Sequence, residues 1–125
     1  MNNLKNLSVE IYKQNKAKGF WSENPKERNF GGVIALIHSE LSKALEADRK
    51  GKRFLSCPSK FIELNNELFK EAFEDYIKDS VEDELADVVI RVLDYCGAMD
   101  IDIEKHIEAK LRYNKMRSYK HGKAY

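Results

Sequence analysis

Chain-breaking residues are few in this sequence and lie far apart, which favours long helices over strands. The chain has two prolines, Pro25 and Pro58, so none occurs in the last 67 of its 125 residues. No stretch alternates apolar and polar residues between turn residues, as an amphipathic strand would. We therefore predict an all-α fold of about five helices, forming a single domain over 1–125.

Local sequence features set the expected ends of these helices. Gly19 and Gly97 stand where apolar periodic segments end, as glycines after a helix C-terminus do. Pro58 is placed to occupy the first turn of a helix. Ser80 is placed as an N-cap, because a serine oxygen can accept a backbone N–H of the first turn. The expected helices are 4–18, 30–50, 58–76, 80–96 and a fifth that begins at Asp100 or Asp102 and reaches 118.

The overall composition limits the classes of partner. The 22 Lys and Arg residues balance 21 Asp and Glu residues, for a net charge of +1, whereas a general nucleic-acid binder carries a basic excess. No apolar run reaches the length of a membrane span, and the N-terminus lacks the apolar segment of a secretion signal. Cys57 and Cys96 show no metal-ligand spacing, which favours reduced thiols over a zinc site. We expect a cytoplasmic protein that binds neither nucleic-acid polymers nor membranes.

Charge is segregated along the chain despite this balance. Ten acidic residues lie between Glu63 and Asp87, against two lysines, Lys70 and Lys78. From Lys110 to the end there are six cationic residues and no acidic one. Two interpretations remain open: two solvated faces of opposite sign, or an acidic cation site opposite a basic phosphate site.

Glu40 stands in an apolar stripe of the second expected helix. At about 100° per residue, it falls in the middle of that stripe. A carboxylate that faces a core is costly unless it is paired or bound to a metal. A buried salt bridge or an open interface would also explain its position. The apolar members of the stripe are Val33, Leu36, Ile37, Ala44 and Ala47.

Glu84 and Asp87 lie one turn apart on the fourth expected helix, beside its apolar face. Two carboxylates at this spacing repel each other, unless a cation lies between them and a facing helix. A set of carboxylate ligands suits a hard divalent cation, chiefly Mg²⁺, with Mn²⁺ as a second choice. Acidic residues are also common on exposed helices, so the pair indicates a metal site only when it is considered together with Glu40. The expected apolar face of this helix comprises Val81, Leu85, Val88, Val89, Val92 and Cys96.

The last expected helix changes character along one face. Its first part is apolar, and its second part carries cationic, amide and aromatic side chains. Lysine and arginine there suit a polyphosphate, asparagine a base or sugar, and tyrosine either packing or stacking. A helix end whose cations favour the C-terminal dipole would account for the cations but not for the asparagine. The face runs from Ile103 and Ile107 through Lys110, Tyr113, Asn114 and Arg117.

Three stretches of the chain carry motifs that occur together in one enzyme family. The stretch 35–46 holds Glu40 in an incomplete E-x-x-E pattern, and 81–91 holds a complete E-x-x-D pattern. The stretch 110–117, followed by His121-Gly122-Lys123, has the form K-x-x-Y-N-x-x-R-x-x-x-H-G-K. Together they resemble the MazG-like family of all-α nucleoside triphosphate pyrophosphohydrolases. The resemblance covers nearly the whole chain apart from about 52–77, where members vary in length.

This resemblance implies hydrolysis of a ribo- or deoxyribonucleoside triphosphate to the monophosphate and pyrophosphate, as part of nucleotide-pool housekeeping. It implies Mg²⁺ as the cofactor, with Glu40, Glu84 and Asp87 as the metal-binding and catalytic carboxylates. Independently of the resemblance, five helices in 125 residues with Glu40 in an apolar stripe suggest a bundle that a second subunit completes, so we expect a homodimer or homotetramer.

The same resemblance implies roles for cationic and aromatic residues around the substrate. Lys110, Arg117 and Lys78 are implied to hold phosphates, with Tyr113 beside them and Asn114 in contact with the sugar or base. For Trp21 two interpretations remain open: stacking on the base, or a packed aromatic ring that anchors a loop.

Lys43 departs from the family pattern, which has a second glutamate at this position. Glu46 cannot replace that glutamate, because it lies about 120° around the helix from Glu40. An ammonium group at position 43 could take the place of a second cation, contact a phosphate or weaken metal binding. Two other functions therefore stay open: a catalytically weak nucleotide-binding or regulatory homologue, and an all-α interaction protein whose acids pair across an interface.

Overall fold

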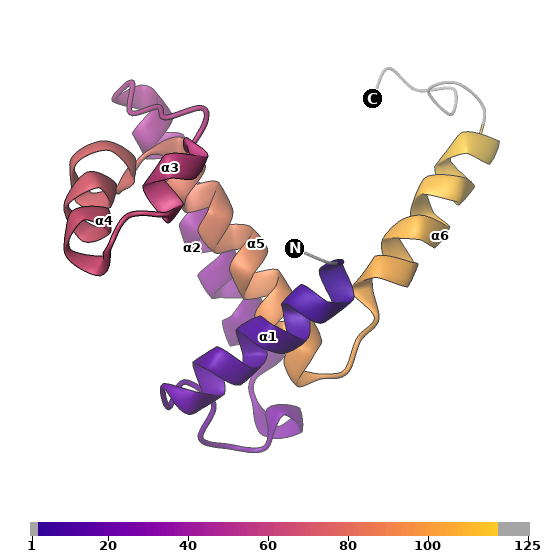
Figure 1. Ribbon diagram of the computed structural model, residues 1–125. Helices are drawn as coiled ribbons and strands as arrows, with labels where there is room; N and C mark the ends of the chain where they lie inside the picture. Colours follow the sequence, from indigo (N-terminus) through magenta and orange to yellow (C-terminus); the bar gives the residue numbers. More distant parts are fainter. Residues whose placement is uncertain (1–2, 118–125) are drawn as a thin grey trace. The chain divides into compact units, whose positions relative to one another are not determined.

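The computed structural model describes residues 3–117, which form helices joined by loops and contain no strand (Figure 1). The predicted all-α fold is confirmed, and the predicted number of about five helices is close to the observed number. The described residues form α1 (Leu4–Ala17), α2 (Phe30–Arg49), α3 (Ser59–Ile62), α4 (Asn66–Ala72), α5 (Val81–Ala98) and α6 (Ile103–Met116), with a 3-10 turn at Pro25–Glu27 and a π-helical turn at Phe73–Ile77.

The single helix predicted over 58–76 is wrong, because the chain breaks between α3 and α4. Asn65 caps α4: its side-chain oxygen accepts the backbone N–H of Leu68 at 3.0 Å. An asparagine at the N-cap stabilises the start of a helix, because its side chain accepts a backbone N–H of the first turn that would otherwise lack a partner. Pro58 is the N-cap residue of α3 and does not occupy its first turn. This region is therefore a set of short helices, α3, α4 and the π-helical turn.

The chain divides into two compact units. One comprises Met1–Lys26 and Leu93–Tyr125, and the other comprises Glu27–Val92. We call them the terminal unit and the central unit. Helix α5 contributes residues to both.

In the terminal unit, α1 passes close to the end of α5 at Gly97 (Figure 1). A Cβ atom at this position would lie 2.8 Å from Cβ of Tyr12 and 2.9 Å from the backbone carbonyl carbon of Ser8. Ser8 is correspondingly buried. The prediction that Gly97 ends the fourth helix is wrong, since α5 continues to Ala98. The glycine is required by the close approach of two backbones.

We expect Gly97→Ala to destabilise the protein by about 2–3 kcal/mol, because the added methyl group meets backbone atoms that cannot rotate away. Urea denaturation followed by circular dichroism measures this change. Gly32→Ala is the matched control within α2: the added Cβ would lie 3.9 Å from Oδ1 of Asn29, and alanine favours the helix by up to about 1 kcal/mol. Equal stability of the two variants would contradict the close approach.

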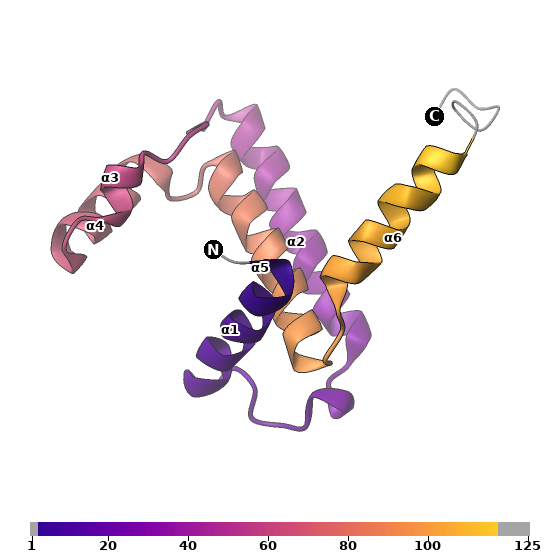
Figure 2. The same cartoon turned by 45° about the vertical axis from the view of Figure 1, so that its right-hand side comes forward.

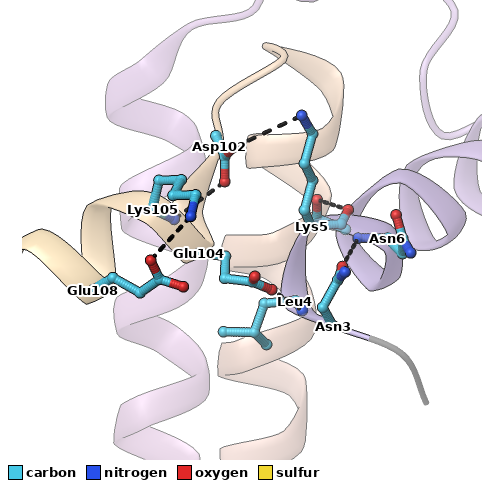
Figure 3. A network of polar contacts seen from close by, with 9 residues as sticks. Asn3, Leu4, Lys5, Asn6, Asp102, Glu104, Lys105 and Glu108 are labelled. Atoms are coloured by element: carbon cyan, nitrogen blue, oxygen red, sulfur yellow. Dashed lines mark hydrogen bonds and ion pairs between the residues drawn. The ribbon is translucent and has the colours of Figure 1, made fainter.

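Polar contacts join the beginnings of α1 and α6 (Figure 3). The backbone N–H of Leu4 donates to Oε1 of Glu104 at 2.8 Å, and Nζ of Lys5 lies 3.8 Å from Oδ2 of Asp102. Asp102 is the N-cap of α6, as one of the two sequence alternatives predicted. A free N–H at the start of a helix favours a carboxylate partner. These contacts place the first turn of α6 against the first turn of α1.

In the central unit, α2 and the first part of α5 run antiparallel and side by side (Figures 1 and 2). Ala44, Ala47 and Val81 form a small buried cluster at one end of this pair. Two alanines on α2 let the helices approach closely. The backbone N–H of Val81 donates to the carbonyl oxygen of Lys52 at 2.9 Å, which ties the start of α5 to the chain after α2. These contacts fix which residues of α2 lie opposite which residues of α5.

The exposed and buried faces of this pair differ in part from the sequence prediction. Leu36, Leu85 and Val89 were expected in the core, but their exposed fractions are 51%, 45% and 52%. Ser80 does cap α5, because its hydroxyl accepts the backbone N–H of Asp83 at 3.1 Å. Val81 and Cys96 of the predicted apolar face are buried, and Glu84 is buried with them. Among residues 3–117, no helix combines the length and apolar character of a membrane span.

Candidate metal centre

Glu40 lies on the face of α2 that meets α5, and only 4% of it is exposed. Its Oε1 accepts a hydrogen bond from Nη2 of Arg91 on α5 at 3.3 Å. Nζ of Lys43, one turn further along α2, lies 3.6 Å from the same oxygen. The sequence prediction of a carboxylate inside the apolar stripe is thus matched by a buried side chain with two cationic neighbours.

Glu84 is 5% exposed and lies opposite Glu40 on α5. One carboxylate oxygen from each of Glu40, Glu84 and Asp87 lies within 4.8 Å of the other two. Oε2 of Glu40 and Oε2 of Glu84 are buried and have no hydrogen-bond partner among the described residues. Buried carboxylate oxygens without a partner are rare, because each loses its hydration without compensation. Two oxygens of this group of three carboxylates therefore lack a positively charged or proton-donating partner, although Oε1 of Glu40 has two.

The proximity of these carboxylates changes their ionisation. The pKa of Glu84 is raised to about 7, because burial disfavours its charged form and the neighbouring Glu40 repels a second negative charge. Burial also opposes the ionisation of Glu40, but its contact with Glu84 and the two nearby cations outweigh this, so the pKa of Glu40 is lowered. Burial and the charges of Glu40 and Asp83 raise the pKa of Asp87. Below about pH 7 the pair of Glu40 and Glu84 therefore holds one proton, on Glu84.

The donor set fits a hard divalent cation. Three carboxylates with converging oxygens are typical ligands of Mg²⁺ or Mn²⁺, and the two unpartnered oxygens would gain a partner. A second group, Asp79, Asp83 and Glu84, also has converging oxygens. In that group Oδ2 of Asp83 already accepts the backbone N–H of Asp79 at 2.9 Å. The unpartnered oxygens therefore favour the first group.

A cavity of about 520 Å³, which we call the polar cavity, adjoins the carboxylates within the central unit. Glu84 and Asp87 line it, together with three lysines, Lys43, Lys70 and Lys78. Lys78 was predicted from the sequence as a phosphate ligand, and the structure places it beside the carboxylates. Lys70 was not predicted, because a lysine within an acidic segment resembles an ordinary surface residue. Five acidic side chains line the cavity in all, Glu74, Asp79, Asp83, Glu84 and Asp87. An anionic ligand there would therefore need its own metal ion, in addition to the three lysines, to balance the charge.

Arg91 also escaped the sequence prediction as a residue of the site. It follows Asp87 by four positions and Glu84 by seven, so all three share one side of α5. This spacing was visible in the sequence, but only the position of Glu40 on the facing helix shows that the guanidinium points to a carboxylate. Arg91 and Lys43 together hold Glu40 in its ionised form.

The residues predicted from the last helix lie in the terminal unit, on α6 or directly after it. Lys110, Tyr113, Asn114 and Arg117 are all exposed. Nζ of Lys110 lies 5.4 Å from the centre of the Tyr113 ring, and Cζ of Arg117 lies 5.6 Å from it. The structure therefore groups two cations on one aromatic ring. The predicted His121-Gly122-Lys123 ending lies outside the described residues, and a role of this group in phosphate binding stays a prediction.

Trp21 is buried in the terminal unit, where it joins the loop after α1 to α5. Its indole N–H lies 3.0 Å from both carboxylate oxygens of Asp94. The ring of Tyr12 meets it edge to face, with 5.6 Å between ring centres. These contacts match the interpretation of Trp21 as an anchor for a loop, and stacking on a base stays a prediction.

Comparison with family models, curated proteins and solved structures found no match for this chain.

Proposed function

We propose that this chain is a Mg²⁺-dependent nucleoside triphosphate pyrophosphohydrolase of the MazG-like kind. The observation that carries the proposal is the group of Glu40, Glu84 and Asp87, in which two buried carboxylate oxygens lack a partner. The adjoining cavity with three lysines supports a phosphate-bearing ligand. The free thiols of Cys57 and Cys96 are in keeping with a cytoplasmic enzyme.

In this proposal each residue of the site has a separate task. The three carboxylates hold the metal ion, which when bound neutralises the charge that develops on the phosphate oxygens. Lys43, Lys70 and Lys78 bind phosphate oxygens from the cavity side. A carboxylate that the metal ion does not fully engage would accept the proton of an attacking water. Arg91 keeps Glu40 ionised and oriented.

A catalytically weak nucleotide-binding homologue is the second candidate function. It is favoured by the cations on Glu40, since Nη2 of Arg91 and Nζ of Lys43 both lie within 3.6 Å of Oε1. These cations supply part of the positive charge that a metal ion would otherwise supply. Such a protein would bind triphosphates and release little pyrophosphate.

A panel of ribo- and deoxyribonucleoside triphosphates with Mg²⁺, assayed for pyrophosphate and orthophosphate separately, tests the proposal. We expect pyrophosphate and the monophosphate as the products of at least one triphosphate. Thermal stabilisation by Mg²⁺ and triphosphate without turnover would support the second candidate instead. Absence of both effects would leave the carboxylates as pairing groups of an interaction protein.

We also propose that the chain works as a homodimer or homotetramer. Leu41 and Leu45 on α2 and Leu85 and Val89 on α5 form pairs one turn apart, and each of these residues is 43% to 54% exposed. Neighbouring exposed apolar side chains of this kind mark an interface. Sedimentation velocity at micromolar concentration should show a species larger than a monomer, and a monomer alone would contradict this proposal.

A further inference from the structure

A second cavity of the central unit, of about 250 Å³, is lined mostly by apolar side chains. We call it the aromatic cavity. It is lined by the rings of Phe54, Phe69 and Phe73. Two exposed apolar residues, Leu55 and Ile62, also line it. Most of these residues come from the segment between α2 and α5, where α3, α4 and the π-helical turn lie. The segment between α2 and α5 therefore supplies most of the residues that line this cavity.

The aromatic rings are fixed by their neighbours. Phe54 stacks on Phe61, with 6.0 Å between ring centres, and lies 6.4 Å from the ring of Tyr76. The backbone N–H of Phe54 donates to Oε1 of Glu82 at 2.7 Å, while Nε of Arg53 donates to the other oxygen of Glu82 at 2.9 Å. The Phe54 ring is therefore held by its ring neighbours and by its backbone hydrogen bond. Binding of a flat ligand to this ring would cost little conformational entropy.

The aromatic cavity adjoins the polar cavity beside the carboxylates. Phe69, Phe73 and Asp83 line both of them. A volume of 250 Å³ is below the range of about 300–1,000 Å³ for pockets that hold a whole drug-sized ligand. The two cavities together suit a ligand with a flat apolar part and an anionic part.

We propose that the aromatic cavity binds the nucleobase of the triphosphate whose phosphates occupy the polar cavity. This inference rests on the proposed function and adds the part of the chain that selects the base. Aromatic side chains stack on any base, because every base has a π-face. Asp83 stands at the junction of the cavities, where its carboxylate can accept a hydrogen bond from an exocyclic amino group.

The charges at the two cavities distinguish a nucleotide from other apolar occupants. Two carboxylates, those of Glu82 and Asp83, line the aromatic cavity, and an acyl chain would place its methylene groups against these charged side chains. Lys43, Lys70 and Lys78 in the adjoining cavity would contact the phosphates of the same ligand, and its metal ion would offset the five acidic side chains there. An apolar side chain of a second copy would fill the aromatic cavity but leave these lysines unused.

Cys57 makes the proposal testable without turnover. It is exposed and lines the aromatic cavity, whereas Cys96 is buried and burial raises the pKa of its thiol. Iodoacetamide should therefore alkylate Cys57 first, because the thiolate of an accessible cysteine reacts faster. We expect a nucleoside without phosphates to slow this alkylation about tenfold when its concentration is ten times its Kd. Inorganic tripolyphosphate with Mg²⁺ should leave the rate unchanged, because it reaches only the polar cavity.

Leu55→Trp and Leu68→Trp form a matched pair of variants. Both replace an exposed leucine, but Leu55 lines the aromatic cavity and Leu68 does not. Tryptophan at position 55 should fill the cavity and abolish protection by the nucleoside, whereas the variant at position 68 should keep it. Circular dichroism of both variants confirms that they fold.

The outcomes separate this inference from the proposed function. Protection of Cys57 by a nucleoside, lost in Leu55→Trp, supports the aromatic cavity as the base site even if no triphosphate is hydrolysed. Pyrophosphate release without protection by any nucleoside overturns the inference and leaves the proposed function intact. Alkylation that slows with protein concentration in the absence of any nucleoside also overturns it, because a second copy then covers the cavity.

Discussion

The substitution Glu84→Gln is expected to reduce pyrophosphate release by at least about 100-fold, because even residues that only orient metal ligands contribute 10- to 100-fold. Glutamine keeps the size of the side chain but removes the charge from a group that lies within 4.8 Å of Glu40 and Asp87. Stabilisation of the substrate-free protein by Mg²⁺ should disappear together with activity. Steady-state pyrophosphate assays and thermal unfolding with and without Mg²⁺ measure the two effects.

The same substitution should stabilise the metal-free protein, and only at high pH. Glu84 has a pKa of about 7 in the folded protein, above its usual value of 4.5. Its contribution to stability is therefore complete below about pH 4.5 and is lost as the pH rises through 7. Glutamine stays neutral, so the gain at pH 8 is on the order of 3 kcal/mol and vanishes near pH 4.5. A neutral amide can also donate to the unpartnered oxygen of Glu40.

Glu46→Gln is the control on α2, because Glu46 is half exposed and pairs only with surface cations. We expect its stability to change by less than about 0.5 kcal/mol at either pH. Asp87→Asn should abolish activity as Glu84→Gln does. Undiminished turnover of either site variant would contradict the assignment of the metal centre.

The position of Glu40 could be predicted from the sequence, because it depends on the geometry of one helix. Residues three and four apart share a face in any α-helix, so a glutamate between Ile37 and Ala44 had to lie among apolar neighbours. The pairing of Glu84 with Asp87 followed from the same rule. The three carboxylates of the site could therefore be predicted from the sequence, whereas Lys70 and Arg91 could not.

Features that depend on a second helix could not be predicted in this way. The face of α5 that is buried is decided by where α2 packs, which is why Glu84 is buried while Leu85 and Val89 are exposed. Gly97 was interpreted as a helix end because the crossing of α1 leaves no trace in the local sequence. Likewise, the aromatic cavity arises only when Phe54, far along the chain from Phe73, packs in the same unit.

Lys43→Glu is expected to tighten Mg²⁺ binding and to raise turnover at limiting Mg²⁺. In the structure Nζ of Lys43 lies 3.6 Å from Oε1 of Glu40, so the ammonium group faces the carboxylates although much of the side chain is exposed. Replacing it with a carboxylate removes a competing cation and adds a fourth oxygen ligand. We expect about a tenfold lower Mg²⁺ concentration at half-maximal effect, which corresponds to about 1.4 kcal/mol.

Without metal the same variant should be less stable than the wild type. A fourth negative charge beside Glu40 and Glu84 has no cation to balance it, and the surviving contact of Glu40 with Arg91 cannot compensate for both changes. Mg²⁺ should reverse this loss, so the difference in melting temperature between metal-free and metal-bound protein widens. The measurement needs no nucleotide and therefore reports on the metal centre alone.

Two further variants identify the cause of any change. Lys43→Gln removes the positive charge without adding a ligand, and it should give an intermediate Mg²⁺ affinity. Lys50→Glu reverses a charge at the C-terminal end of α2, where Nζ of Lys50 lies 3.9 Å from the exposed Glu46. This control variant should bind Mg²⁺ about as tightly as the wild type, because exposed ion pairs contribute little. If Lys43 instead binds a phosphate, Lys43→Glu should raise the KM for the triphosphate while Mg²⁺ binding to the free protein stays the same. Because Lys43 lies between Glu40 and the polar cavity, the balance between these two results shows whether it substitutes for a metal ion or holds the substrate.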